Sequence, residues 1–152
     1  MATTLKEWIT SGIDDECVKH AEAFAKGIVP ENSDKTFGIN KDLALTSSQI
    51  RISFGEVRRI QQRTLTHNAD SPLDAESTRS LALLRPKLAY ATARASKDEK
   101  KGKTGAELLE NELNKALDCI QASQKGATRR FQNFCDYFEA ILAYHKKFGG
   151  KD

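Results

Sequence analysis

The sequence predicts an all-α protein, a single compact bundle of about five helices that spans residues 1–152. Three observations carry this prediction. Apolar residues recur at intervals of three and four along several long segments, which is the spacing of one helical face. No segment alternates β-branched and polar residues as a half-buried strand does. With 39% hydrophobic residues, the chain has enough apolar content for one core.

The first element is predicted to be a helix over residues 4–28, in which Ser11 and Gly12 provide a point for a break. Three acidic residues beginning at Asp14 suit the start of its second part, because the positive end of the helix dipole favours anions. Residues 30–45 contain Pro, Gly, Asn and scattered charges, so we expect a loop there.

The helix predicted over residues 46–65 organises the rest of the chain. Thr46 and Gln49 have the spacing of a capping box, which marks its start. Four residues form its apolar stripe at helical pitch: Ile50, Phe54, Val57 and Leu65. Its cations form two pairs beside that stripe: Arg51 with Arg58, and Arg59 with Arg63.

The third helix is predicted over residues 73–96, with Leu81, Leu84 and Leu88 in its apolar stripe. Pro86 lies inside this segment and cannot donate a backbone hydrogen bond, so we expect a kink or a break near Leu84. Residues 96–105 are highly charged and contain two glycines, which predicts a loop.

Two further helices complete the predicted bundle. Thr104 and Glu107 have capping-box spacing and start a helix that runs towards Gly126. The last helix, over residues 128–148, has the densest apolar stripe in the chain and ends at Gly149-Gly150. Because it has the most apolar surface to bury, it should be the central helix of the bundle.

The sequence lacks the usual marks of an enzyme, a cofactor site or a metal site. Phosphate-loop, nucleophile-elbow and dinucleotide motifs are missing, and three histidines lie singly in different elements. The acidic cluster at residues 107–112 is explained by its position at a helix N-terminus. Cys17, Cys119 and Cys135 are an odd, widely spaced set, which indicates buried thiols in a reducing compartment. We therefore expect no enzyme activity, no cofactor and no metal.

We also expect a cytoplasmic protein with no membrane partner. The chain has no run of 18 apolar residues, and its first residues lack the apolar segment of a secretory signal.

The charge is concentrated in the middle of the chain. Residues 46–103 hold 12 Lys or Arg and 6 Asp or Glu, whereas residues 1–45 hold 5 and 8, and residues 104–152 hold 7 of each. This asymmetry favours a surface that faces a polyanion about as strongly as it favours a solvated basic face. Arginine suits phosphate because its planar guanidinium can bond two oxygens at once. A second basic patch follows, with one aromatic ring: Arg85, Lys87, Tyr90 and Arg94.

Two residues within these basic segments each have two interpretations. Gly55 costs about 1 kcal/mol in a helix relative to alanine. It allows either close approach by a partner or nucleic acid, or tight packing against another helix. Tyr90 either stacks on a base or is a half-buried core residue.

Three blocks of sequence resemble a known family. They are SQIRISFGEVRRIQ, LLRPKLAYATAR and FCDYFEAILAYHKKFGGKD, in this order between residues 48 and 152. Together they resemble the small all-helical subunit of the type III-A CRISPR–Cas effector, the Csm complex.

The resemblance implies a non-catalytic subunit of an antiviral complex. Several copies would stack on one another beside the backbone and large subunits, and would contact the backbones of guide RNA and target RNA. The candidate contacts carried over are Arg51, Arg58, Arg59, Lys87 and Arg94, and the neighbouring cations Arg63 and Arg85 complete the set. The sequence departs from the family pattern at Gly55, where a bulkier residue is expected, and at Arg85, where lysine is usual.

The residues alone leave a second hypothesis open. The same arginines can pair with acidic residues of a neighbouring protein. The chain would then be a structural protein–protein interaction module of a multisubunit assembly, with no direct contact to nucleic acid.

Overall fold

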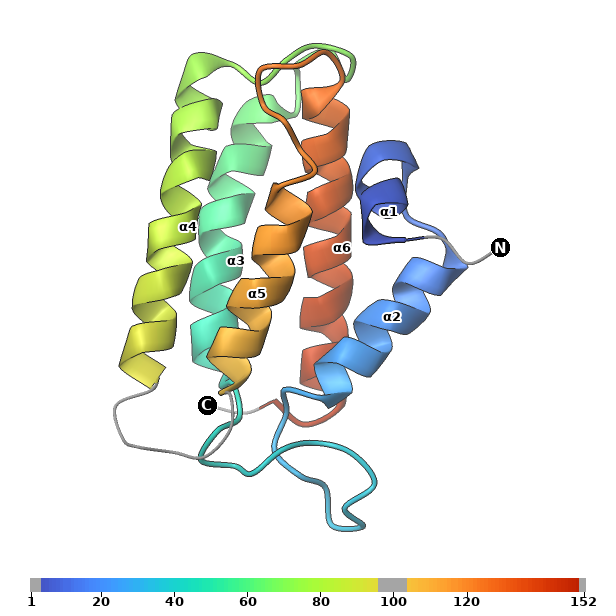
Figure 1. Cartoon of the computed structure of the whole chain (residues 1–152), viewed down its shortest axis with the longest axis vertical. Coiled ribbons are helices and arrows are strands. Elements are labelled where there is room, and N and C mark those ends of the chain that lie inside the picture. The colour runs from blue at the N-terminus through green and yellow to red at the C-terminus, as the bar shows by residue number, and fades with distance from the viewer. Residues whose placement is uncertain (1–3, 96–103, 151–152) are drawn as a thin grey trace.

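The computed structural model describes residues 4–95 and 104–150, and in this part of the chain it contains six α-helices and no strand. They are α1 (Leu5–Ser11), α2 (Asp15–Lys26), α3 (Ser47–Thr64), α4 (Ala75–Ala95), α5 (Gly105–Leu117) and α6 (Ala127–Lys147). Helices α3 to α6 lie side by side, and α1 and α2 lie against the opposite side of α6 (Figure 1). The all-α bundle is confirmed, with one helix more than the expected five.

The additional helix comes from the break at Gly12. This glycine has a φ of 122°, a backbone conformation that L side chains rarely adopt, and it ends α1. Asp14 then starts α2 by accepting a hydrogen bond from the Cys17 backbone N–H at 2.9 Å. The first segment therefore forms two helices that meet α6 separately.

Helix α4 is continuous through Pro86, so of the expected kink or break near Leu84, the break is wrong. Proline removes the hydrogen bond that would reach the carbonyl of Ala82. Both residues are exposed, which leaves water able to satisfy that carbonyl. The loop predicted over residues 96–105 ends one residue earlier than expected, because Gly105 already belongs to α5. Residues 96–103 lie outside the described part of the chain.

Helix α5 is shorter than predicted. It ends at Leu117, and Gln121 takes a φ of 52°, which leaves the right-handed helical region. The Arg130 guanidinium donates to the Ile120 carbonyl at 2.7 Å and holds the segment after α5 against the start of α6. Ile120 is buried, as its apolar spacing predicts, although it lies outside the helix.

Helix α6 is the central helix of the core, as predicted. Its fully buried side chains include four rings: Phe131, Phe134, Tyr137 and Phe138. Phe138 meets Phe54 of α3 edge-on, with ring centroids 5.1 Å apart. Leu65, expected in the α3 stripe, instead lies after the end of α3 and is exposed.

The predicted loop before α3 is ordered against three other elements. Leu45 donates its backbone N–H to the Ile28 carbonyl at 2.9 Å, and the Leu45 carbonyl lies 2.9 Å from Nε2 of buried His145. Burial lowers the pKa of His145, so the ring is neutral and donates to this carbonyl. The Gly105 N–H donates to Leu43 at 2.6 Å. These contacts fix the start of α3 relative to α5 and α6.

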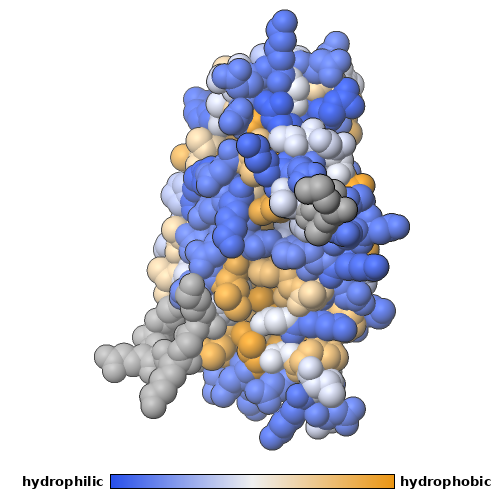
Figure 2. All heavy atoms as spheres, turned by 45° about the vertical axis from the view of Figure 1, so that its right-hand side comes forward, coloured by the Kyte–Doolittle hydropathy of each residue, from blue (hydrophilic) through white to orange (hydrophobic). Residues whose placement is uncertain are grey.

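The molecular surface is mainly hydrophilic on the side that carries α1, α2 and α6. Figure 2 shows this side, with a hydrophobic area in its lower half. None of the helices within residues 4–95 and 104–150 has both the length and the apolar character needed to cross a membrane.

Candidate nucleic-acid interface

The seven predicted contact residues do not share one face. Arg51 and Arg58 lie on the side of α3 that adjoins α6. The Arg58 guanidinium lies 3.9 Å from the Glu139 carboxylate of α6 and 5.7 Å from the centre of the Phe54 ring. Arg51 donates to the Ser47 carbonyl one turn earlier, at 3.3 Å. Both side chains are exposed at the edge of this helix pair.

Gly55 lies between these arginines on the exposed surface of α3. A Cβ placed on Gly55 would have no atom of another element within 4 Å. The interpretation of Gly55 as a helix-packing glycine is therefore wrong. Its backbone is open to a partner, and we call the surface formed by Arg51, Gly55, Arg58 and Arg59 the outer face of α3.

Arg59 is the most exposed of the cations on this face that form ion pairs, with 78% of its side chain accessible to solvent. It lies 3.5 Å from Glu56 of the same helix. Lys87 of α4 reaches the other oxygen of the same carboxylate at 2.9 Å. Glu56 thus holds a cation from each of two helices, and Lys87 lies on the side of α3 away from Arg51.

Arg63 and Arg85 tie helices together. Arg63 reaches α4, where its guanidinium lies 3.4 Å from Glu76 and 3.4 Å from the Ser80 hydroxyl. Arg85 extends in the opposite direction from α4 and lies 2.8 Å from Asp118, just after α5. These two arginines therefore have structural partners on two different sides of α4.

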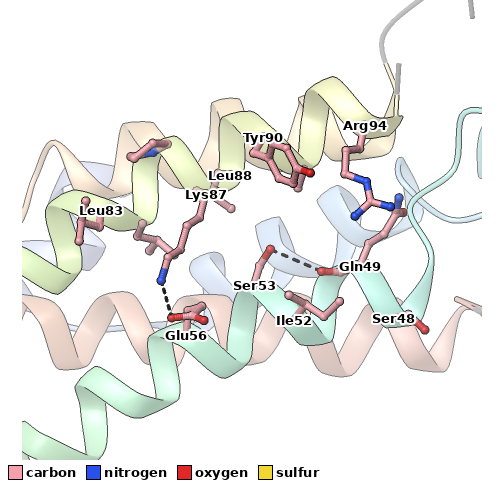
Figure 3. A pocket seen from close by; sticks show the side chains of 13 residues that line it. Ser48, Gln49, Ile52, Ser53, Glu56, Leu83, Lys87, Leu88, Tyr90 and Arg94 are labelled. Atoms are coloured by element: carbon pink, nitrogen blue, oxygen red, sulfur yellow. Dashed lines mark hydrogen bonds and ion pairs between the residues drawn. The ribbon is translucent and has the colours of Figure 1, made fainter. Parts of the chain in front are cut away.

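Helices α3 and α4 enclose a groove of about 760 Å³ between their exposed edges, which we call the α3/α4 groove. Its lining includes Ile52 and Glu56 of α3 and Leu83, Lys87 and Tyr90 of α4, and Figure 3 shows Lys87 pointing from α4 towards Glu56. Tyr90 is 66% exposed, so its interpretation as a half-buried core residue is wrong. The Arg94 guanidinium lies 5.9 Å from the centre of the Tyr90 ring.

The structure also brings two lysines of α6 to Arg51 that sequence reasoning missed. A depression of about 840 Å³ between α3 and α6 is lined by Arg51, Lys146 and Lys147, together with one carboxylate, Glu139, and other polar and apolar residues. Lys146 and Lys147 occur in the last turn of the helix, where the dipole alone accounts for cations. In the sequence, these two lysines were marked only by their place in the third of the three blocks that resemble a known family.

A polar cluster around the buried side chains of Glu112 and Tyr137 joins α2, α5 and α6. The Tyr137 hydroxyl donates to the Glu112 carboxylate, and His20 Nε2 lies 2.8 Å from the same oxygen. Burial, together with this hydrogen bond, raises the pKa of Tyr137, which therefore remains a donor. The helix dipole is thus not the explanation for Glu112, which is a buried acceptor inside the bundle.

The thiols in the core are unreactive. Burial raises the pKa of Cys17 to about 12 and also raises the pKa of Cys135. Both side chains remain protonated and are poor nucleophiles. Cys119 is only partly buried, contrary to expectation. Among the described residues, no group of three or more His, Cys, Asp or Glu side chains is placed to hold a metal ion.

The family model described as Csm2 Type III-A matches residues 15–151. The chain belongs to this family. It is a small subunit of the multisubunit type III-A CRISPR–Cas Csm complex, and the resemblance seen in three blocks is confirmed. The Csm2 match also extends further towards the N-terminus than those blocks and includes α2. No curated protein matches the chain.

Proposed function

We propose that this Csm2-family chain is a non-catalytic cytoplasmic subunit that contacts the backbone of the guide–target RNA duplex, mainly the target strand, through the outer face of α3. Several copies would act together within one antiviral complex. The observation that carries the proposal is Gly55, which leaves the helix backbone open between exposed arginines. A residue that lowers helix stability and packs against nothing fits a surface that a partner must approach closely.

Electrostatics support the same surface. Ion pairs between exposed side chains contribute about 0–1 kcal/mol, because water and salt screen them. The pair of Arg58 with Glu139 is of this kind, and in the pair of Arg59 with Glu56 the arginine is exposed while the carboxylate is half-buried. A phosphate can therefore replace either carboxylate at little cost, and each guanidinium can bond two phosphate oxygens. Lys146 and Lys147 extend the cationic surface beyond Arg51.

The other four predicted contact residues are expected to contribute less to RNA binding than the outer face of α3. Lys87 and Arg94 lie at the α3/α4 groove, on the other side of α3, so they are not part of this surface and we expect no RNA contact from them. Arg63 and Arg85 hold neighbouring helices together, so we expect smaller contributions from them.

The test is target-RNA binding by the complete guide-loaded complex, measured over a range of salt concentrations. The variant subunit carries Arg51→Gln, Arg58→Gln and Arg59→Gln. The matched control is Arg129→Gln, which also removes an exposed arginine with a carboxylate partner, Asp70 at 2.9 Å. The plot of the logarithm of the association constant against the logarithm of salt concentration should become less steep. Its slope should shrink in magnitude by about 0.7–0.9 for each phosphate that the variant no longer binds, and by the same amount for unrelated target sequences. An unchanged slope in an intact complex would contradict the proposal.

A second candidate function is a structural module whose arginines pair with acidic residues of a neighbouring subunit. It is favoured by a specific observation: five of the seven predicted cations already face carboxylates, namely Arg58, Arg59, Arg63, Arg85 and Lys87. In that case the triple variant should lose co-purifying subunits, while the complexes that still form keep their full RNA affinity.

A further inference from the structure

Exposed apolar side chains gather at the α3/α4 groove. Among the described residues, four large hydrophobic side chains are exposed, and three of them line this groove: Ile52 at 71%, Tyr90 at 66% and Leu83 at 50%. The fourth, Leu65, lies elsewhere. Contiguous apolar surface of this kind marks an interaction site more often than single exposed residues do.

The groove has the dimensions of a helix-binding site. Along α4 its lining runs from Leu83 to Arg94. Eleven steps at 1.5 Å per residue span about 16 Å, which is three turns of an α-helix. Leu84 and Leu88 form a buried apolar floor between the two helices. A helical segment of about eleven residues can therefore lie along the groove with its apolar face inward.

The charges of the groove indicate which segment fits. Lys87 is already neutralised by Glu56, 2.9 Å away. Arg94 lies over the Tyr90 ring, and within residues 4–95 and 104–150 no carboxylate lies at ion-pair distance from it. Within the described residues, Arg94 is thus a positive charge at one end of the groove without a carboxylate partner, and an acidic side chain of the partner would match it.

The same features argue against RNA as the occupant. The lining is mainly aliphatic and offers a single ring for base stacking. The Glu56 carboxylate enters the groove (Figure 3), where it would repel a phosphate and compete with it for Lys87. Tyrosine and arginine are enriched at protein–protein interfaces, and here both stand beside aliphatic residues. The lining therefore fits a protein partner better than RNA.

We propose that the α3/α4 groove docks an amphipathic helical segment of a different subunit of the complex. The segment would present apolar residues at i, i+3 or i+4, and i+7, with an acidic side chain opposite Arg94. The inference rests on the groove and on membership of a multisubunit complex. It does not require RNA contact at the outer face of α3, so either proposal can fail without the other.

The test is site-specific photocrosslinking in the assembled complex. A benzophenone amino acid replaces Leu83 in one sample and Leu65 in the control, since both are exposed leucines and only Leu83 lines the groove. Position 83 should crosslink to a peptide of another subunit with the apolar spacing and acidic residue described, and position 65 should not. Crosslinks from position 83 to RNA, to a second copy of this chain, or to nothing in an assembled complex would overturn the proposal.

A binding measurement with the crosslinked peptide completes the test. The full chain should bind the synthetic peptide, and Tyr90→Ala should weaken binding at least tenfold because buried tyrosines dominate such interfaces. Arg94→Glu should weaken it as well, and a peptide with lysine in place of the acidic residue should restore the affinity of that variant. Tyr90 is exposed, so its loss should leave the melting temperature unchanged. Equal peptide affinity for all variants would overturn the proposal.

Discussion

The same substitution, glycine to alanine, should have opposite effects at two helical positions of this chain. At Gly55 the new methyl group meets no atom of another element within 4 Å, so only the backbone effect remains. Alanine is more favourable than glycine inside a helix by about 0.8–1.0 kcal/mol. For a domain of this size, 1 kcal/mol corresponds to roughly 2–4 °C in melting temperature. Gly55→Ala should therefore raise the melting temperature by that amount.

At Gly105 the same methyl group has no room. Its Cβ would lie 2.6 Å from the backbone nitrogen of Leu45 and 2.9 Å from the Leu45 Cβ. The backbone of Leu45 must then move, although it is held by a hydrogen bond to Ile28. Such overpacking costs about 1–3 kcal/mol, so Gly105→Ala should lower the melting temperature by several degrees.

Urea unfolding of the two variants and the wild-type chain, followed by circular dichroism, measures both effects. The midpoints should move in opposite directions, and the slopes should remain equal if only native-state stability changes. A destabilised Gly55→Ala would refute the reasoning, because it would mean that the backbone of Gly55 is packed against another part of the chain. A neutral Gly105→Ala would refute the close contact with Leu45.

Three further changes test other parts of the bundle. Pro86→Ala should raise the free energy of unfolding by up to about 3 kcal/mol, measured in urea, because α4 is continuous there and regains a backbone hydrogen bond. Tyr137→Phe should lower it by about 1.5–3 kcal/mol, because Glu112 loses a donor inside the bundle; an unchanged midpoint would mean that the cluster is not structural. His145 has a lowered pKa, so the folded state binds fewer protons than the unfolded state and stability rises with pH. The free energy of unfolding should therefore fall as the pH drops below about 6.5, and this fall should be smaller in His145→Gln.

Most of the architecture follows from local sequence signals. The capping pairs at Thr46 and Thr104 and the apolar stripe of α6 are set by residues three or four apart, so they can be read without knowing the fold. The errors occur where distant segments decide the outcome. The end of α5 depends on Arg130, which binds carbonyls after that helix from the start of α6. Pro86 is tolerated because its part of α4 remains exposed after the bundle forms.

The candidate site depends still more on long-range placement. Helical spacing assigns each arginine an angle on α3, but it cannot say which helix lies at which angle. Once α6 is known to lie beside Arg58 and α4 beside Glu56, the predicted cations divide between two surfaces. Gly55 and Tyr90 were ambiguous for the same reason, since their exposure depends on neighbours that the spacing does not specify. Both proved to be exposed: Gly55 lies on the arginine-bearing side of α3, and Tyr90 lies at the apolar groove on its other side.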